Sequence, residues 1–229
     1  MEPANRFAAN CRTTAKISGN RYTLSAGIQY YQPNCCTIMA LLLCIDSSTT
    51  HASVAVAKDG ILLGIKTNTT QKDHASFLQP AIHTLLQELE LTVKQLEAVA
   101  VTTGPGSYTG LRVGLASAKG LCFALNIPLI GIHTTQVISA AARKSIPEKD
   151  GFIFCPMVDA RRMEVFTALY FPDLKEMSPI TSKVLTVDSF QELLELQPVY
   201  FIGDGCVKWQ NICTCLLYTS PSPRDRTRS

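Results

Sequence analysis

Glycine, hydroxyl and cationic residues crowd into one stretch, TTGPGSYTGLRVGLASAKGL, at residues 102–121. Gly104, Gly106 and Gly110 allow backbone angles that a side chain would forbid, and Ser107 or Thr109 can cap the helix expected to follow. Backbone N–H groups at the start of such a helix favour an anion. The stretch therefore has the chemistry of an anion-binding or nucleotide-binding turn.

Two known phosphate-binding motifs fail to match this loop. A P-loop requires a Lys directly after its last glycine, yet the nearest Lys here is Lys119. The dinucleotide motif G-x-G-x-x-G fails because Gly110 comes one position late. The apolar strand LLLCID ends in Asp46, a further candidate for the anion site, but SSTT follows it without a glycine. Capping of that turn by Asp46 is the favoured interpretation.

A stripe of small residues marks the helix after the loop. Gly110, Gly114 and Ala118 recur every four residues, with Ser117 beside them. Two glycines inside a helix cost roughly 1 kcal/mol each relative to Ala, so a close neighbour is expected to compensate. That neighbour is either the chain's own fold or another subunit, and spacing alone leaves the two equal. If it is a subunit, Gly114→Leu should abolish association while the fold persists.

Composition and charge describe an ordinary globular protein. Of the 229 residues, 46% are hydrophobic and 17% charged, and no apolar run approaches the roughly 18–20 residues that a membrane helix needs. The net charge of +3 comes from the two ends, because residues 39–215 hold two more acids than bases. Direct nucleic-acid binding is therefore disfavoured. Nine cysteines without a C-x-x-C pair favour a reducing, cytoplasmic compartment.

The order of expected elements predicts two lobes. Residues 39–145 show three strands followed by alternating helices and strands, which predicts a mixed sheet with helices on its faces. Residues 146–215 restart this pattern, so the second lobe is expected to be a truncated copy of the first. Residues 1–38 are expected to be extraneous or disordered, with Met39 as the true start, and residues 216–229 to be a non-native or disordered tail.

Three segments resemble the TsaB (YeaZ) family: LLLCIDSSTTHASVAV, HASFLQPAIHTLLQE and GPGSYTGLRVGLASAKGL. The resemblance covers residues 39 to about 210 and implies the two-lobed actin/Hsp70/sugar-kinase fold, which is ribonuclease H-like. It also implies a non-catalytic subunit in the synthesis of N6-threonylcarbamoyladenosine on tRNA. The implied partners are the catalytic TsaD paralogue and an ATPase subunit, with tRNA contacted only indirectly. A homodimer stays open as an alternative.

The resemblance further implies which positions contact a partner or a nucleotide and which lack the metal ligands of the catalytic paralogue. The catalytic paralogue holds a metal through two His residues four apart, and the matching positions here are Thr134 and Ile138. Neither can replace an imidazole ligand, so no metal site, no catalytic residue and no cofactor of its own are expected. The resemblance also implies that the helices expected at residues 111–123 and 76–89 pair with the catalytic subunit. The expected partner contacts are Gly110, Arg112, Gly114, Ser117, Ala118, Phe77 and Ile82. A nucleotide at the subunit interface would use Gly104, Gly106, Ser107, Thr109 and Asp46.

A metal- or ATP-dependent enzyme of the same superfamily, a peptidase or a phosphotransferase, is the alternative function. Such an enzyme needs paired metal ligands or paired carboxylates that face a cleft. The sequence offers only the isolated acids Asp46, Asp159 and Glu164. Stoichiometric zinc or iron in the purified protein would favour the enzyme over the subunit.

Overall fold

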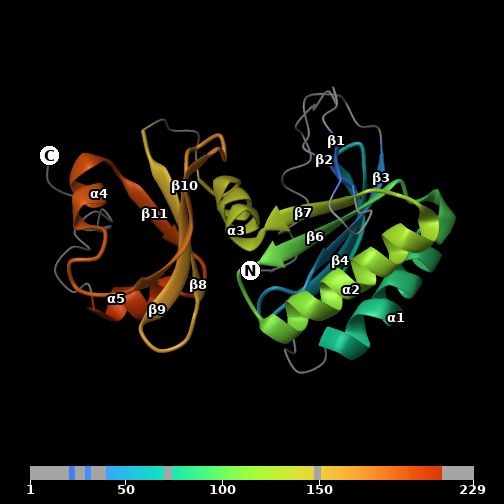
Figure 1. Ribbon diagram of the computed structural model, residues 1–229, viewed down its shortest axis with the longest axis horizontal. Helices are drawn as coiled ribbons and strands as arrows, with labels where there is room; N and C mark the ends of the chain where they lie inside the picture. The colour runs from blue at the N-terminus through green and yellow to red at the C-terminus, as the bar shows by residue number, and fades with distance from the viewer. Residues whose placement is uncertain (1–20, 24–28, 32–39, 70–73, 147–150, 213–229) are drawn as a thin grey trace, which may run out of the picture. The chain divides into compact units, whose positions relative to one another are not determined.

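The computed structural model describes residues 21–23, 29–31, 40–69, 74–146 and 151–212 (Figure 1). They divide into two compact units, Met1–Pro147 and Glu148–Ser229. Within the expected N-terminal extension the structure describes only the short strands β1 (Arg21–Thr23) and β2 (Gln29–Tyr31), which pair antiparallel. The expected tail and the expected truncation near residue 215 lie outside the described residues.

The first unit is a seven-stranded mixed sheet with the order β1-β2-β7-β6-β3-β4-β5. Strands β3, β4 and β5 form an antiparallel meander, while β6 and β7 run parallel to β3. This arrangement is the α/β, ribonuclease H-like class that the sequence predicts. Its elements are β3 (Leu41–Asp46), β4 (Ala52–Lys58), β5 (Ile61–Asn68), α1 (His74–Glu88), the 3-10 turn η2 (Val93–Gln95), β6 (Ala98–Gly104), α2 (Tyr108–Leu125), β7 (Leu129–His133) and α3 (Thr134–Arg143).

Helices α1 and α2 lie side by side over one face of this sheet (Figure 1). The apolar residues of α1 recur at helical spacing, so Leu78, Ile82 and Leu85 all turn to the core. They pack with the strand residues Leu43, Val54 and Val99 and their neighbours. Each such side chain contributes roughly 1.5–3 kcal/mol when it is fully buried. The core of this unit therefore fixes both helices on the sheet.

The second unit is a four-stranded sheet with the order β10-β9-β8-β11, in which β11 is parallel to β8. Trp209, Met157 and Val165 lie at its core. Its elements are β8 (Ile153–Asp159), β9 (Glu164–Tyr170), β10 (Glu176–Val184), α4 (Gln191–Leu196), β11 (Val199–Ile202) and α5 (Cys206–Ile212). In the described part of either unit, no helix combines the length and the hydropathy that a bilayer crossing requires.

Candidate functional site

The glycine loop lies between the carboxyl end of β6 and the start of α2. Gly104 and Gly106 have φ angles of +109° and +155°, which side-chain-bearing residues rarely adopt. A Cβ on Gly106 would collide with the carbonyl oxygen of Ser48, whose oxygen also accepts the N–H of Ser107 at 2.7 Å. The loop is therefore seated on the turn that follows β3, and the glycine makes that close approach feasible.

Asp46 ends β3 and is only 8% exposed. Its Oδ1 accepts three hydrogen bonds, from Ser48 N at 3.0 Å, Ser48 Oγ at 2.7 Å and Thr102 Oγ1 at 3.0 Å. These donors belong to the turn after β3 and to β6, so the carboxylate ties the two together. This geometry agrees with the interpretation of Asp46 as a turn cap. Its part in binding a nucleotide stays a prediction.

The small residues of α2 face the chain's own fold. Ser47 Oγ donates to the carbonyl of Gly110 at 2.8 Å, and a Cβ on Gly114 would collide with that same hydroxyl oxygen. Ala118 is fully buried. The expectation that Gly110, Gly114 and Ala118 contact a partner is therefore wrong, because β3 and its turn occupy that side of the helix. Gly114→Leu would disrupt the fold itself and cannot report on association.

Two expected contacts on α1 also need correction or restriction. Ile82 is 4% exposed and belongs to the core, so the expectation that it contacts a partner is wrong. Phe77 is half-buried and packs against the same core.

Ser117 on α2 is half-buried and its hydroxyl accepts a hydrogen bond from Gln79 Nε2 at 3.0 Å. This bond joins α1 to α2 at the outer side of the pair.

The opposite face of α2 is exposed and carries large side chains. Tyr108, Arg112, Ala116, Lys119 and Phe123 follow one another at helical spacing, and we name them the α2 stripe. Phe123 is 92% exposed and Tyr108 is 73% exposed. Arg112 Nη1 donates to the Tyr108 hydroxyl at 3.1 Å, and its guanidinium carbon lies 5.2 Å from the centroid of that ring. Of the seven expected contacts, Arg112 alone belongs to this stripe.

Phe123 is not among the seven residues expected to contact a partner, although it ends the helix at residues 111–123 that the resemblance implies for pairing. The glycines drew attention to the small face of the helix, although an aromatic side chain on the far face carries more binding energy. The signal was present in the spacing, because Phe123 shares a helical face with Arg112 and Lys119, whereas Gly114 does not. An exposed apolar ring among cations on one helix face is typical of a surface that another molecule covers.

The family model described as "TsaD: tRNA N6-adenosine threonylcarbamoyltransferase" matches residues 47–204. The tRNA threonylcarbamoyladenosine biosynthesis protein TsaB of Bacillus subtilis is 32% identical over 165 residues, which cover 71% of this chain and 70% of that protein. The TsaB of Buchnera aphidicola from Schizaphis graminum is 34% identical over 176 residues, which cover 75% of this chain and 80% of that protein. The chain belongs to the TsaB family.

One solved structure agrees with this membership of the TsaB family, and a second shares the fold. YeaZ from Pseudomonas aeruginosa superposes with a TM-score of 0.56 at 27% identity, covering 64% of this chain and 68% of its own. An uncharacterized protein with similarity to peptidase YEAZ from Pseudomonas aeruginosa superposes with a TM-score of 0.58 at 20% identity, covering 76% of this chain and 91% of its own. The second likeness bears on the fold alone.

The positions that the resemblance matches to the metal-binding histidines of the TsaD paralogue lie in α3. Thr134 begins that helix, is 1% exposed, and its hydroxyl oxygen has no hydrogen-bond partner. Ile138 is half-buried, and His133 is exposed at the end of β7. Within the described ranges, no three His, Cys, Asp or Glu side chains gather into a group that could hold a metal ion.

The two other isolated acids lie in the second unit. Glu164 is half-buried at the start of β9. Asp159 ends β8 and contacts Lys208 Nζ at 2.6 Å. Desolvation works against its charged form, but hydrogen bonds from Lys208 and from the Arg161 N–H outweigh this, so the pKa of Asp159 lies below its usual value. Asp159 therefore stabilises a turn through its negative charge.

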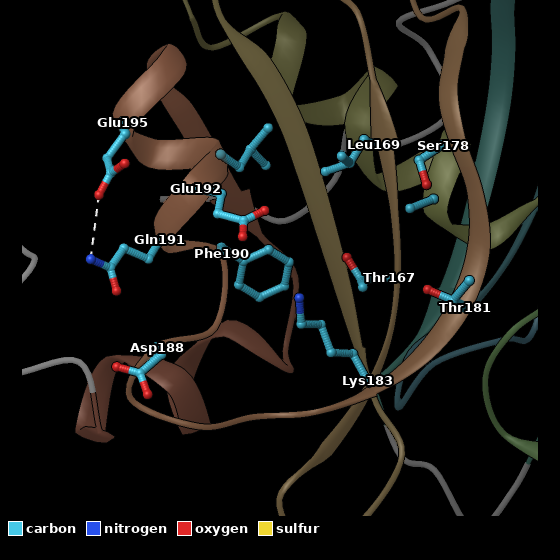
Figure 2. A pocket seen from close by; sticks show the side chains of 12 residues that line it. Thr167, Leu169, Ser178, Thr181, Lys183, Asp188, Phe190, Gln191, Glu192 and Glu195 are labelled. Carbon is cyan, nitrogen blue, oxygen red and sulfur yellow. Dashed lines mark hydrogen bonds between the residues drawn. The ribbon is translucent and has the colours of Figure 1, made fainter.

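A cavity of about 660 Å³ opens in the second unit between β9, β10 and α4 (Figure 2). Lys183 Nζ lies 4.2 Å from the centroid of the Phe190 ring, and Thr167 and Thr181 line the strand side. Gln191 Nε2 donates to Glu195 Oε1 at 3.3 Å along α4. None of the residues expected to bind a partner or a nucleotide lines this cavity.

Proposed function

We propose that the chain is a non-catalytic subunit of the assembly that makes N6-threonylcarbamoyladenosine on tRNA. In that role it binds the TsaD-family threonylcarbamoyltransferase through the α2 stripe and the adjoining outer side of α1. The names of its TsaB relatives and of the matching family model support a role in this tRNA modification. The exposure of Phe123 is the single observation that carries the docking role.

The argument from Phe123 is energetic. A phenylalanine that stays in water forgoes the roughly 1.5–3 kcal/mol that burial of its side chain would supply. Aromatic and arginine side chains are enriched among the residues that dominate protein–protein binding energy. Here an arginine stacked on a tyrosine and an isolated phenylalanine share one face of a helix whose other face is fixed to the core. Such a rigid, partly apolar face supports docking of another protein.

A nucleotide at the junction stays a prediction. The start of α2 offers backbone N–H groups that favour an anion, and Thr109 is exposed in the first turn. The Ser107 hydroxyl is already engaged by the Gly110 N–H at 3.3 Å, as expected of a helix cap. The donors left for a phosphate would therefore come from the backbone and from Thr109.

Co-purification of the full chain with the TsaD-family transferase of the same organism tests the proposal. We expect Phe123→Ala to weaken this association about tenfold or more, because removal of a central aromatic contact costs on the order of 1.4 kcal/mol or more. Leu196→Ala is the matched control, since Leu196 is an apolar residue of the second unit and is 80% exposed. Its association and the circular dichroism of both variants should equal those of the wild type.

Two results would overturn the proposed function. Failure of the wild-type chain to associate with the transferase would remove the docking role. Equal loss of association in Phe123→Ala and Leu196→Ala would show that exposed apolar residues matter in general and that the α2 stripe does not.

A further inference from the structure

The cavity of the second unit, between β9, β10 and α4, brings opposite charges together without pairing them (Figure 2). Lys183 lines it from β10 and Glu192 from α4, and within the described residues neither side chain forms an ion pair. Its volume of about 660 Å³ lies in the range of small-molecule sites. We propose that this cavity binds a free amino acid with an apolar side chain. This small-molecule role goes beyond the proposed function, which uses helices of the first unit.

The amino group of Lys183 is the anion-binding end of the cavity. Its Nζ lies 4.2 Å from the centroid of the Phe190 ring, and the side chain is half-buried. An aromatic face attracts a cation but leaves its charge unneutralised and its N–H donors available. Thr167 and Thr181 line the strand side of the cavity and add hydroxyl groups. A carboxylate that enters here would gain a charge-assisted hydrogen bond from Lys183.

The Phe190 ring that supports Lys183 is itself held in place. Phe190 has a φ angle of +67°, a backbone conformation that bulky residues rarely adopt and that persists only when the surrounding structure holds it. Its ring centroid lies 5.4 Å from that of Phe201 and 5.5 Å from that of Trp209. The Trp209 side chain is only 3% exposed. This aromatic cluster therefore fixes the ring on which Lys183 rests.

Glu192 supplies the opposite charge from α4. Figure 2 shows its side chain extending from α4 toward the strands, whereas the Asp188 carboxylate points away from them. Glu195 also lines the cavity, but its Oε1 already accepts a hydrogen bond from Gln191 Nε2 at 3.3 Å. Glu192 is therefore the carboxylate best placed to accept the ammonium group of a ligand.

A ligand with both a carboxylate and an ammonium group satisfies the two ends together. A simple anion would pair with Lys183 but meet the like charge of Glu192, and a simple cation would meet the like charge of Lys183. Leu169 and Leu193 also line the cavity and would cover an apolar side chain of the ligand. An apolar amino acid therefore matches this site better than a ligand with charge of one sign.

Three ligands of similar shape separate the two ends. L-Leucine carries both charges, 4-methylpentanoate lacks the ammonium group, and 3-methylbutylamine lacks the carboxylate. Each is titrated into the full chain and followed by the fluorescence of Trp209, the single tryptophan, whose ring contacts Phe190. Equilibrium dialysis is the second measurement, because it detects binding that leaves the fluorescence unchanged. We expect L-leucine to bind at least about tenfold more tightly than either analogue.

Two substitutions assign the ends. Lys183→Met keeps an unbranched side chain over Phe190 without the charge, and Glu192→Gln removes the charge of the other end. Each should weaken L-leucine binding about tenfold or more. Lys183→Met should also remove the preference for L-leucine over 3-methylbutylamine, and Glu192→Gln the preference over 4-methylpentanoate. A merely structural role of either residue would not produce this exchange of preferences.

Lys183→Arg and Lys175→Met are the controls. The arginine keeps a cation and should retain binding within a few-fold of the wild type. Lys175 belongs to the same unit, pairs with Asp173 at 2.8 Å and does not line the cavity, so Lys175→Met tests the loss of one positive charge elsewhere. Its affinity for L-leucine should stay within about twofold of the wild type.

Three results would overturn the amino-acid site. The first is L-leucine that fails to bind by fluorescence and by dialysis, and the second is an analogue that binds as tightly as L-leucine. The third is an equal loss of binding in Lys175→Met and Lys183→Met. The docking role of α2 is tested separately by Phe123→Ala, so either proposal can fail while the other stands.

Discussion

Asp46 in the first unit and Asp159 in the second each end a strand and fix the turn that follows it. Asp46 ends β3 and accepts the N–H of Ser48, while Asp159 ends β8 and accepts the N–H of Arg161. In both cases the donor is two residues further along, which is the geometry of an Asx turn. The order of elements predicts that the second unit repeats the first, and these two aspartates are a likeness between the units at the level of single residues. In each unit the acid fixes a turn.

Asp159 should make the second unit sensitive to acid. Its pKa is below the unfolded value of 3.8, so the stability that it contributes is present above that pH and is lost as the pH falls through the folded pKa. We expect the wild type to lose more stability than Asp159→Asn between about pH 5 and pH 3. The asparagine keeps an oxygen acceptor for the Arg161 N–H but has no charge for Lys208.

Unfolding followed by Trp209 fluorescence measures this difference, because that ring is buried in the same unit. Near neutral pH the variant should be within about 1 kcal/mol of the wild type, as expected for a partly exposed ion pair. Parallel stability curves for the two proteins across the acid range would contradict the role given to Asp159.

Helix α2 has one face packed against the fold and one exposed face, and a glycine lies on each. Gly114 lies against Ser47, whereas a Cβ on Gly120 would meet nothing within 4 Å. We expect Gly114→Ala to lower the free energy of unfolding by about 1–3 kcal/mol through overpacking. Gly120→Ala should raise it by about 0.5–1 kcal/mol, because alanine is the better helix former.

Urea unfolding followed by far-ultraviolet circular dichroism tests the pair. The double variant Ser47→Ala/Gly114→Ala should recover part of the loss, since the colliding hydroxyl is gone, although the hydrogen bond to Gly110 goes with it. Equal stability of Gly114→Ala and Gly120→Ala would mean that the close contact between α2 and the turn after β3 does not hold.

The sequence predicts the elements of this region but not which face of α2 is buried. Hydrophobic spacing predicts α1, and the glycine loop with Ser107 predicts the start of α2. Helical spacing also shows that Gly110, Gly114 and Ala118 share a face. It does not show what that face meets, because Ser47 lies more than sixty residues earlier and reaches Gly110 only in the folded chain. The assignment of the partner surface therefore failed at Gly110, Gly114 and Ala118.

At the scale of the whole molecule, the proposed function assigns chemistry to the TsaD paralogue and docking to this chain. The present chain has the glycine loop, the paired helices α1 and α2, and the seven-stranded sheet. At the two positions that the resemblance matches to metal-binding histidines of the paralogue, it carries Thr134 and Ile138. A threonine hydroxyl and an isoleucine cannot hold a zinc or iron ion as imidazoles do. The proposed docking role rests on the exposed aromatic and cationic face of α2.

The central claim is that the exposed face of α2 docks the TsaD-family transferase. Hydroxyl-radical footprinting of the chain with and without that transferase tests it most directly. Tyr108 and Phe123 are exposed in the free chain and should oxidise rapidly, whereas in the complex both rates should fall several-fold. Phe171 of the second unit is 42% exposed and serves as the internal reference, with an unchanged rate. A complex in which Tyr108 and Phe123 oxidise as fast as in the free chain would contradict the account.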